Sequence, residues 1–193
     1  MQVRDAKTVY VCIDIEASGP VPGFYNMVSI GGVAVRLGAA GHERGEEFYY
    51  ELKPISEGFD PHAMSIHGIS RAHLEAHGTD SREVLLSITD WVEQIRGDAE
   101  RVLFVGHNAP FDWMYVAWYF AWAGLQNPFG YNALDTKALM MGRLGLPWRE
   151  CNKERLEATY PALSAPAPED VHNALCDAQF QADILIALLD TEG

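Results

Sequence analysis

The chain has 193 residues, of which 48% are hydrophobic and 21% charged, so it is long enough to bury a full core. Its formal net charge of −13 excludes the broad positive surface of proteins that hold long duplexes. No apolar run reaches the roughly 18 residues that span a bilayer, and the three cysteines lack metal-ligand spacing. We therefore expect a single cytoplasmic domain over residues 1–193, without signal peptide or membrane segment.

The first third of the chain predicts three strands. Residues 9–14 are apolar up to a final aspartate, which indicates a buried strand. A loop rich in Gly and Pro follows at 17–23. Two further strands are expected at 27–37 and 47–52, joined by a hairpin over 38–45.

The rest of the chain predicts helices alternating with short strands. Ser81 is the expected cap of the clearest amphipathic helix. The expected helices are 61–69, 70–77, 81–95, 110 to about 123, 136–144 and 171–189, and the expected strands are 102–105 and 133–134. The Pro- and Ala-rich segment 163–170 is expected to be mobile. Together these elements indicate an α/β fold with a mixed sheet.

Two carboxylates lie at the end of the first predicted strand. Asp14 and Glu16 are two residues apart, so they point to the same face of a strand, about 6.5 Å from each other. Like charges on a buried face repel each other and lose hydration, which is costly unless a cation lies between them. Mg²⁺ or Mn²⁺, held by oxygen ligands, would satisfy this pair.

Three further residues suggest the same chemistry, although each has a structural alternative. Asp112 falls in the first turn of a predicted helix, where the helix dipole alone favours an acid. Asp177 shares a helical stripe with three apolar residues and therefore needs a partner. His172 would lie about 140° around a helix from Asp177, so it belongs in or before the first turn. Together with Asp14 and Glu16, these residues indicate one catalytic site more strongly than five separate structural roles.

The five residues lie in three short segments: 14–16 (DIE), 106–112 (GHNAPFD) and 172–178 (HNALCDA). In this order and spacing the segments resemble the DEDDh 3′→5′ exonucleases, a family that includes ribonuclease T, oligoribonuclease and the proofreading subunit of bacterial DNA polymerase. The resemblance covers about residues 8–190. It implies a ribonuclease H-like fold, in which helices flank a mixed five-stranded sheet.

The resemblance also implies a role for each residue. Asp14, Glu16, Asp112 and Asp177 would hold two Mg²⁺ or Mn²⁺ ions per active site, with Asp14 bridging both. His172 would take the proton from the attacking water, and the products would be 5′-mononucleotides. Because the segment before it is expected to be mobile, His172 is expected to lie away from the metals until substrate binds.

The terminal nucleotide, by the same resemblance, would bind at Ala17, Ser18, Met64 and His67. The main chain of the first two would hold the 3′-OH, where family members often carry a threonine. The expected substrate is a single-stranded 3′ end, of RNA rather than DNA, and the alternative activity is DNA proofreading or repair. An alternative of another class is a non-catalytic module that binds nucleic acid or protein, although the intact set of five residues argues against it.

Aromatic residues crowd the predicted helix that begins near residue 110. The stretch from Trp113 to Trp122 carries more large apolar surface than one face buries easily. Ribonuclease T and oligoribonuclease, which the chain resembles, form dimers, so a homodimer is expected. Nearer the metal motifs, one of Phe24, Tyr25 and Phe111 could stack on a terminal base.

Overall fold

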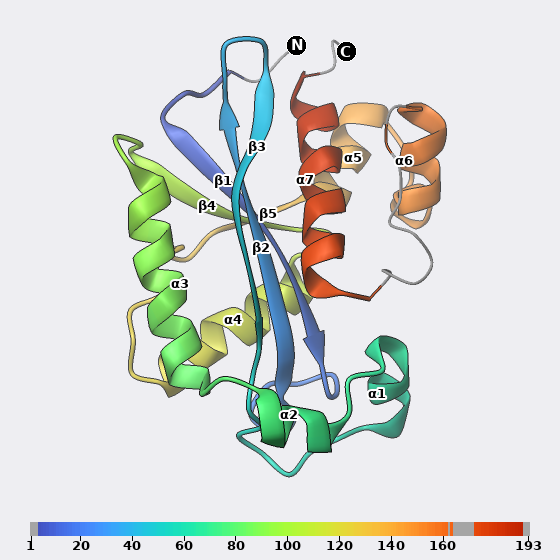
Figure 1. Cartoon of the computed structure of the whole chain (residues 1–193). Helices are drawn as coiled ribbons and strands as arrows, with labels where there is room; N and C mark the ends of the chain where they lie inside the picture. The colour runs from blue at the N-terminus through green and yellow to red at the C-terminus, as the bar shows by residue number, and fades with distance from the viewer. Residues whose placement is uncertain (1–3, 162, 164–171, 191–193) are drawn as a thin grey trace.

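A computed structural model describes residues 4–161, 163 and 172–190 of the chain. Its centre is a five-stranded sheet with the order β3-β2-β1-β4-β5 (Figure 1). The strands are β1 (Thr8–Ala17), β2 (Met27–Leu37), β3 (His42–Glu51), β4 (Arg101–Gly106) and β5 (Ala133–Asp135). β2 runs antiparallel to both of its neighbours, whereas β4 and β5 continue the sheet in parallel with β1. The predicted mixed five-stranded sheet is confirmed.

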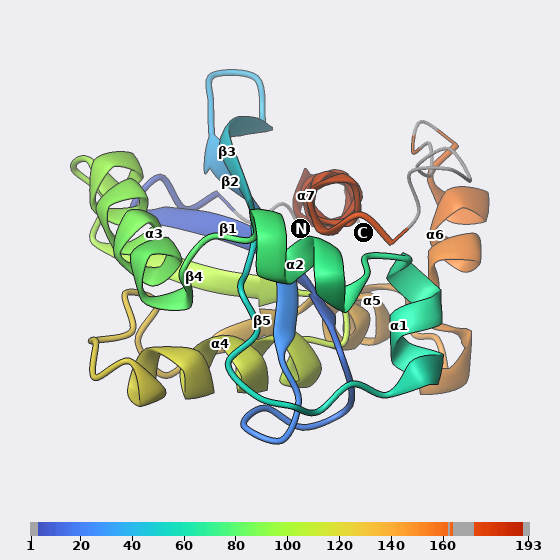
Figure 2. The same cartoon turned by 60° about the horizontal axis from the view of Figure 1, so that its bottom comes forward.

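Helices cover both faces of this sheet. They are α1 (Pro61–His67), α2 (Arg71–His77), α3 (Ser81–Arg96), α4 (Pro110–Trp122), α5 (Thr136–Leu144), α6 (Lys153–Thr159) and α7 (Ala174–Asp190), with a 3-10 turn η1 (Trp148–Glu150). The helices α3 and α4 pack on one face, and α7 packs on the other (Figures 1 and 2). No helix in the described part of the chain is long and apolar enough to cross a membrane.

The alternation of side chains along β1 decides what each residue contacts. Val11 and Ile13 join the core beneath α3 and α4. Tyr10 and Cys12 point the other way and pack against α7. The same period of two puts Asp14 and Glu16 on the face that α7 covers.

The helices α5 and α6 form an outer layer against α7. Met140 of α5 and Leu156 of α6 share a buried cluster with Phe180 and Ile184 of α7. The sequence did not predict α6, a helix of seven residues.

Several boundaries differ from the sequence-based expectation. β1 continues past Asp14 because its pairing with β2 runs on to the pair formed by Ala17 and Met27. The cap of α3 is Asp80 rather than Ser81, since the Asp80 carboxylate accepts two main-chain N–H groups of the first turn. The last helix begins at Ala174 rather than at 171. The segment expected to be mobile lies, apart from Leu163, outside the described residues.

Candidate active site

Asp14 and Glu16 occupy the last part of β1, on the face covered by α7. The pairing of β1 with β4 ends at Cys12, so both carboxylates lie beyond the point where that neighbour stops. Glu16 is 8% exposed, whereas Asp14 is half-buried. Gln181 of α7 donates from Nε2 to Oδ1 of Asp14 over 2.6 Å, which ties the strand carboxylate to the helix above it.

Asp112 reaches the same place from the opposite face of the sheet. It lies in the first turn of α4 and is 5% exposed. Its Oδ1 accepts the main-chain N–H of Ile15, the residue between Asp14 and Glu16, over 3.1 Å. The helix dipole is therefore not the whole reason for an acid here, because this carboxylate is bound directly to the strand that carries the other two.

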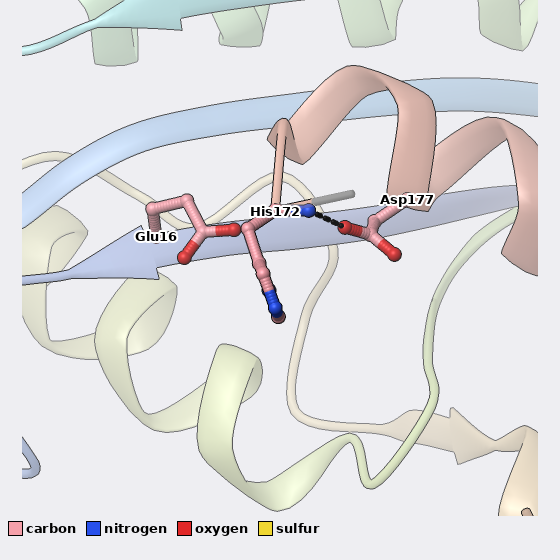
Figure 3. Close-up of side chains that lie close together, drawn as sticks. All are labelled: Glu16, His172 and Asp177. Atoms are coloured by element: carbon pink, nitrogen blue, oxygen red, sulfur yellow. Dashed lines mark hydrogen bonds between the residues drawn. The ribbon is translucent and has the colours of Figure 1, made fainter. Parts of the chain in front are cut away.

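The start of α7 brings in the last two predicted residues. Asn173 caps the helix, with its side-chain oxygen accepting the N–H groups of Leu175 and Cys176. The preceding residue, His172, donates its main-chain N–H to Oδ2 of Asp177 over 2.9 Å (Figure 3). The prediction that the histidine lies in or just before the first turn is confirmed, because α7 begins at Ala174. Asp177 is 4% exposed.

The side chain of His172 lies next to the carboxylates of Glu16 and Asp177 (Figure 3). One ring nitrogen and one oxygen of each carboxylate all lie within 4.8 Å of one another. The structure therefore places His172 at the site, contrary to the expectation that it lies away from the metals until substrate binds. The bond to Asp177 holds the main chain of this residue there.

These side chains enclose a pocket of about 210 Å³. Its lining consists of Asp14, Ile15, Glu16, His107, Asn108, Phe111, Asp112, His172 and Asp177. All five predicted catalytic residues are thus brought together. The described residues that line the pocket include four carboxylates but neither lysine nor arginine. This donor set of hard oxygen atoms suits a divalent cation such as Mg²⁺ or Mn²⁺.

The backbone is strained at two points of this lining. Among the described residues other than glycine, positive φ angles occur at Asn108 (66°) and His172 (67°). Such conformations cost on the order of 1–3 kcal/mol and persist where the surroundings hold them. The main-chain N–H of Asn108 donates to Oδ1 of Asp135. The same oxygen caps α5, so Asp135 has a structural role. Sequence reasoning did not select Asn108, although it lies within the 106–112 motif.

A second pocket of about 400 Å³ adjoins the first. The two share Ile15, Glu16 and Phe111. The remaining lining is mostly apolar and comprises Ala17, Gly19, Pro20, Asp60, His62, Ala63 and Ile66. Of the three aromatic residues considered for base stacking, Phe111 is the one that lines both pockets.

The four expected substrate-binding residues are placed differently from one another. Ala17 lines the apolar pocket. Ser18 is fully buried, donating its hydroxyl to the carbonyl of Gly58 and accepting the N–H of Asn26. On α1, the lining comes from neighbours of Met64 and His67 rather than from these two residues. Burial lowers the pKa of His67, which opposes its protonation.

Comparisons with known proteins bear on this geometry. Residues 9–189 match the model of a family described as the 3′-5′ exoribonuclease Rv2179c-like domain. A curated relative, the 3′-5′ DNA exonuclease Cap18 of Escherichia coli, is 36% identical over 188 residues, which cover 97% of this chain and 95% of the relative.

Solved structures show the same fold at low identity. The nuclease domain of 3′hExo, a DEDDh family member bound to rAMP, superposes with a TM-score of 0.80 at 13% identity, covering 97% of this chain and 94% of that one. The complex of exonuclease I from E. coli with single-stranded DNA, in its zinc-bound form, gives a TM-score of 0.71 at 16% identity, covering 94% of this chain and 40% of that one.

The fold and the matches define a 3′→5′ exonuclease, a hydrolase that acts on nucleic acids. Within the DEDDh exonucleases, the chain belongs to the Rv2179c-like 3′-5′ exoribonuclease domain family. Exonucleases of the DEDDh family use divalent metals, and the carboxylate pocket fits that requirement. The family and the activity predicted from the three motifs are therefore confirmed.

Proposed function

We propose that the chain removes nucleotides one at a time from single-stranded 3′ ends, releases 5′-mononucleotides, and prefers RNA to DNA. The observation that carries this proposal is the contact between the two pockets, which share Ile15, Glu16 and Phe111. A phosphate beside the carboxylates would place the adjoining sugar and base at the apolar pocket. That arrangement suits the last nucleotide of a strand.

The apolar pocket supports a preference for unpaired ends. Its walls include Ala17, Ala63 and Ile66, which can pack against the faces of a base but offer no side-chain hydrogen bonds. A base that enters such a pocket has left its partner strand, which costs least when the end is already single-stranded. We assign Phe111 as the residue that stacks on this base, because it lies where the pockets meet.

The roles of the polar residues follow from their places. Asp14, Glu16, Asp112 and Asp177 would hold two Mg²⁺ or Mn²⁺ ions, which supply positive charge beside the phosphate and lower the pKa of water. His172 would accept the proton of the attacking water, since its ring nitrogen lies next to two of these carboxylates. In addition, Asp112 positions the main chain of β1 through its bond to Ile15.

RNA and DNA are each supported as the substrate by one of the comparisons. The family description names an exoribonuclease, whereas the relative with 36% identity is a DNA exonuclease. RNA is the first assignment, and a DNA exonuclease with proofreading or repair duty is the second. The test is digestion of 5′-labelled RNA and DNA oligomers of matched sequence, with Mg²⁺ and with Mn²⁺.

The expected result is a ladder that shortens from the 3′ end, with a higher kcat/KM for RNA. Faster digestion of DNA would move the assignment to the DNA exonuclease. If neither strand were shortened by the wild-type chain while both were shortened by a control exonuclease, the proposed function would be wrong.

We further propose that residues 1–193 act as a single domain in the cytoplasm, as a homodimer. None of the three cysteines, all of which lie in the described part of the chain, forms a disulfide, which suits a reducing compartment. Phe24 and Trp122 are 77% and 49% exposed, respectively. Apolar surface of this kind supports self-association.

A further inference from the structure

The positive charge of this acidic chain is concentrated in one short stretch. Residues 137–155 hold five of the 14 lysines and arginines but two of the 27 acidic residues. This stretch includes most of α5, the turn η1 and the start of α6. A polyanion that approaches the protein therefore finds a favourable potential locally rather than over the whole surface.

Four described side chains of this stretch contribute to a groove and to a cation–π contact beside it. Arg149 and Arg155 line an open groove of about 330 Å³ where η1 meets α6. Lys137 places its Nζ 4.7 Å from the ring centre of Trp148, and that ring is 46% exposed. We call the surface made by Lys137, Trp148, Arg149 and Arg155 the basic ridge.

The charge of the ridge is available to a ligand. The side chain of Arg149 is 85% exposed, and it forms an ion pair of 3.9 Å with Glu150, which lines the same groove. Exposed pairs of this length contribute little, so a phosphate can compete with the glutamate for the guanidinium.

The ridge is firmly connected to the active site. Thr136, directly before Lys137, holds its hydroxyl 3.0 Å from Nδ1 of His107, and His107 lines the carboxylate pocket. Behind the ridge, α5 and α6 pack on α7, the helix whose first turn carries Asp177. In Figure 2 both helices lie on the side of α7 that faces away from α3. The ridge and the catalytic carboxylates are thus parts of one packed unit.

We propose that the basic ridge binds the single-stranded nucleic acid upstream of the 3′ end that occupies the active site. The arginines and Lys137 would contact phosphates, and Trp148 would stack on a base, a combination that holds single strands with little regard to sequence. This inference rests on the proposed exonuclease function and adds the surface that would retain the rest of the strand.

The test compares two double variants that change the net charge equally. The ridge variant, Arg149→Gln with Arg155→Gln, removes two positive charges from the ridge. The control variant, Lys7→Gln with Arg101→Gln, removes two positive charges near the start of β1 and β4. The carboxylates lie at the opposite end of β1. For each protein, kcat/KM is measured over a range of KCl concentrations on an oligomer of about 12 nucleotides. The same enzymes are assayed on a dinucleotide, which is too short to reach the ridge.

The ridge variant should raise KM for the oligomer and reduce the log–log salt slope by about 1.4, since each phosphate contact on a single strand contributes about 0.7. Its activity on the dinucleotide and the behaviour of the control variant should match the wild type. An unchanged salt slope in the ridge variant would overturn the proposal that the ridge binds the upstream strand. An equal reduction of the slope in the control variant would also overturn it. Absence of digestion by the wild type would instead overturn the exonuclease function, so the two failures are distinguishable.

Discussion

Three of the four carboxylates in the pocket are almost withdrawn from water. Glu16, Asp112 and Asp177 expose 8%, 5% and 4% of their surface, respectively. Acids placed this close to one another in a region of low dielectric destabilise the fold unless a cation is bound. Stability and metal binding are therefore coupled at the level of single residues.

Asp14→Asn should lower the cleavage rate on the order of 10³-fold, because it removes a metal ligand while keeping an acceptor for Gln181. In chelator its melting temperature should stay level or rise, since one repelling charge is lost. Added Mg²⁺ should stabilise the wild type more than the variant. Differential scanning fluorimetry with and without Mg²⁺ measures both effects.

The control for this prediction is Asp183→Asn on α7, which removes a half-buried acid that pairs with Arg44 outside the pocket. This variant should keep the stabilisation by Mg²⁺ and nearly all of the activity. Full activity of Asp14→Asn would contradict the assignment of Asp14 as a ligand.

His172→Ala should reduce turnover by about 10²–10⁴-fold and leave the stabilisation by Mg²⁺ almost intact, as expected for a general base. The alternative is physically open, because the imidazole lies close enough to Glu16 and Asp177 to serve as a third ligand. Single-turnover rates and metal titration of the same sample separate the two roles. A loss of metal affinity as large as that of Asp177→Ala would make the histidine a ligand.

At the scale of elements, the close approach of α7 to the sheet positions Asp177 in the site. Gly31 of β2 lies opposite Asp14 in the strand register. A Cβ atom at Gly31 would lie 2.5 Å from main-chain atoms of Ala174, the first residue of α7. The helix can therefore begin this close to the strand only because residue 31 has no side chain.

Gly31→Ala should displace the first turn of α7 and with it Asp177. We expect a loss of about 1–3 kcal/mol of stability from overpacking and a fall of about 10²-fold in turnover from the displaced ligand. Denaturant unfolding and steady-state kinetics measure these two effects.

The matched control is Gly142→Ala in α5, where an added Cβ meets no atom within 4 Å. That change should stabilise the protein by about 0.5–1 kcal/mol through helix propensity and leave turnover unchanged. If Gly31→Ala behaved like Gly142→Ala, the close approach of α7 would not be what positions Asp177.

At the scale of the whole molecule, the core is built from apolar side chains. Separate apolar clusters fill both sides of the sheet. The proposed ligands line a pocket whose described lining contains no cysteine. The metals should therefore serve catalysis rather than folding.

Chelation should abolish cleavage while the far-ultraviolet circular dichroism spectrum stays the same, and Mg²⁺ or Mn²⁺ should restore activity. Zn²⁺ should not be needed for refolding, because the proposed ligands are oxygen atoms. Collapse of the spectrum in chelator would point to a structural metal.

The aromatic helix bears on the oligomeric state. Tyr115, Tyr119 and Phe120 of α4 are fully buried, so much of its apolar surface is used within the chain. Phe24 and Trp122 remain exposed. Trp122 stacks on Trp118, and Gly23, the chain neighbour of Phe24, lies against the same ring. Sedimentation should give twice the chain mass of 21.4 kDa at micromolar concentration, and Phe24→Ser with Trp122→Ser should give monomers. A monomeric wild type would refute the homodimer.

The sequence alone identified the candidate catalytic residues and their order along the chain. Strand periodicity placed Asp14 and Glu16 on one face, and helical geometry placed His172 in or just before the first turn of the last helix. These inferences succeeded because each depends on residues within a few positions of one another. The same local reasoning identified five strands and most of the helices.

Only the tertiary structure decided how the separate motifs meet. The bond from Ile15 to Asp112 joins residues 97 positions apart, and the bond from Gln181 to Asp14 joins residues 167 apart. Neither contact leaves a local period in the sequence, and neither does the apolar pocket beside the carboxylates. Local spacing fixes the face on which a side chain lies, whereas the packing of β1, α4 and α7 fixes which faces come together and therefore where the site forms.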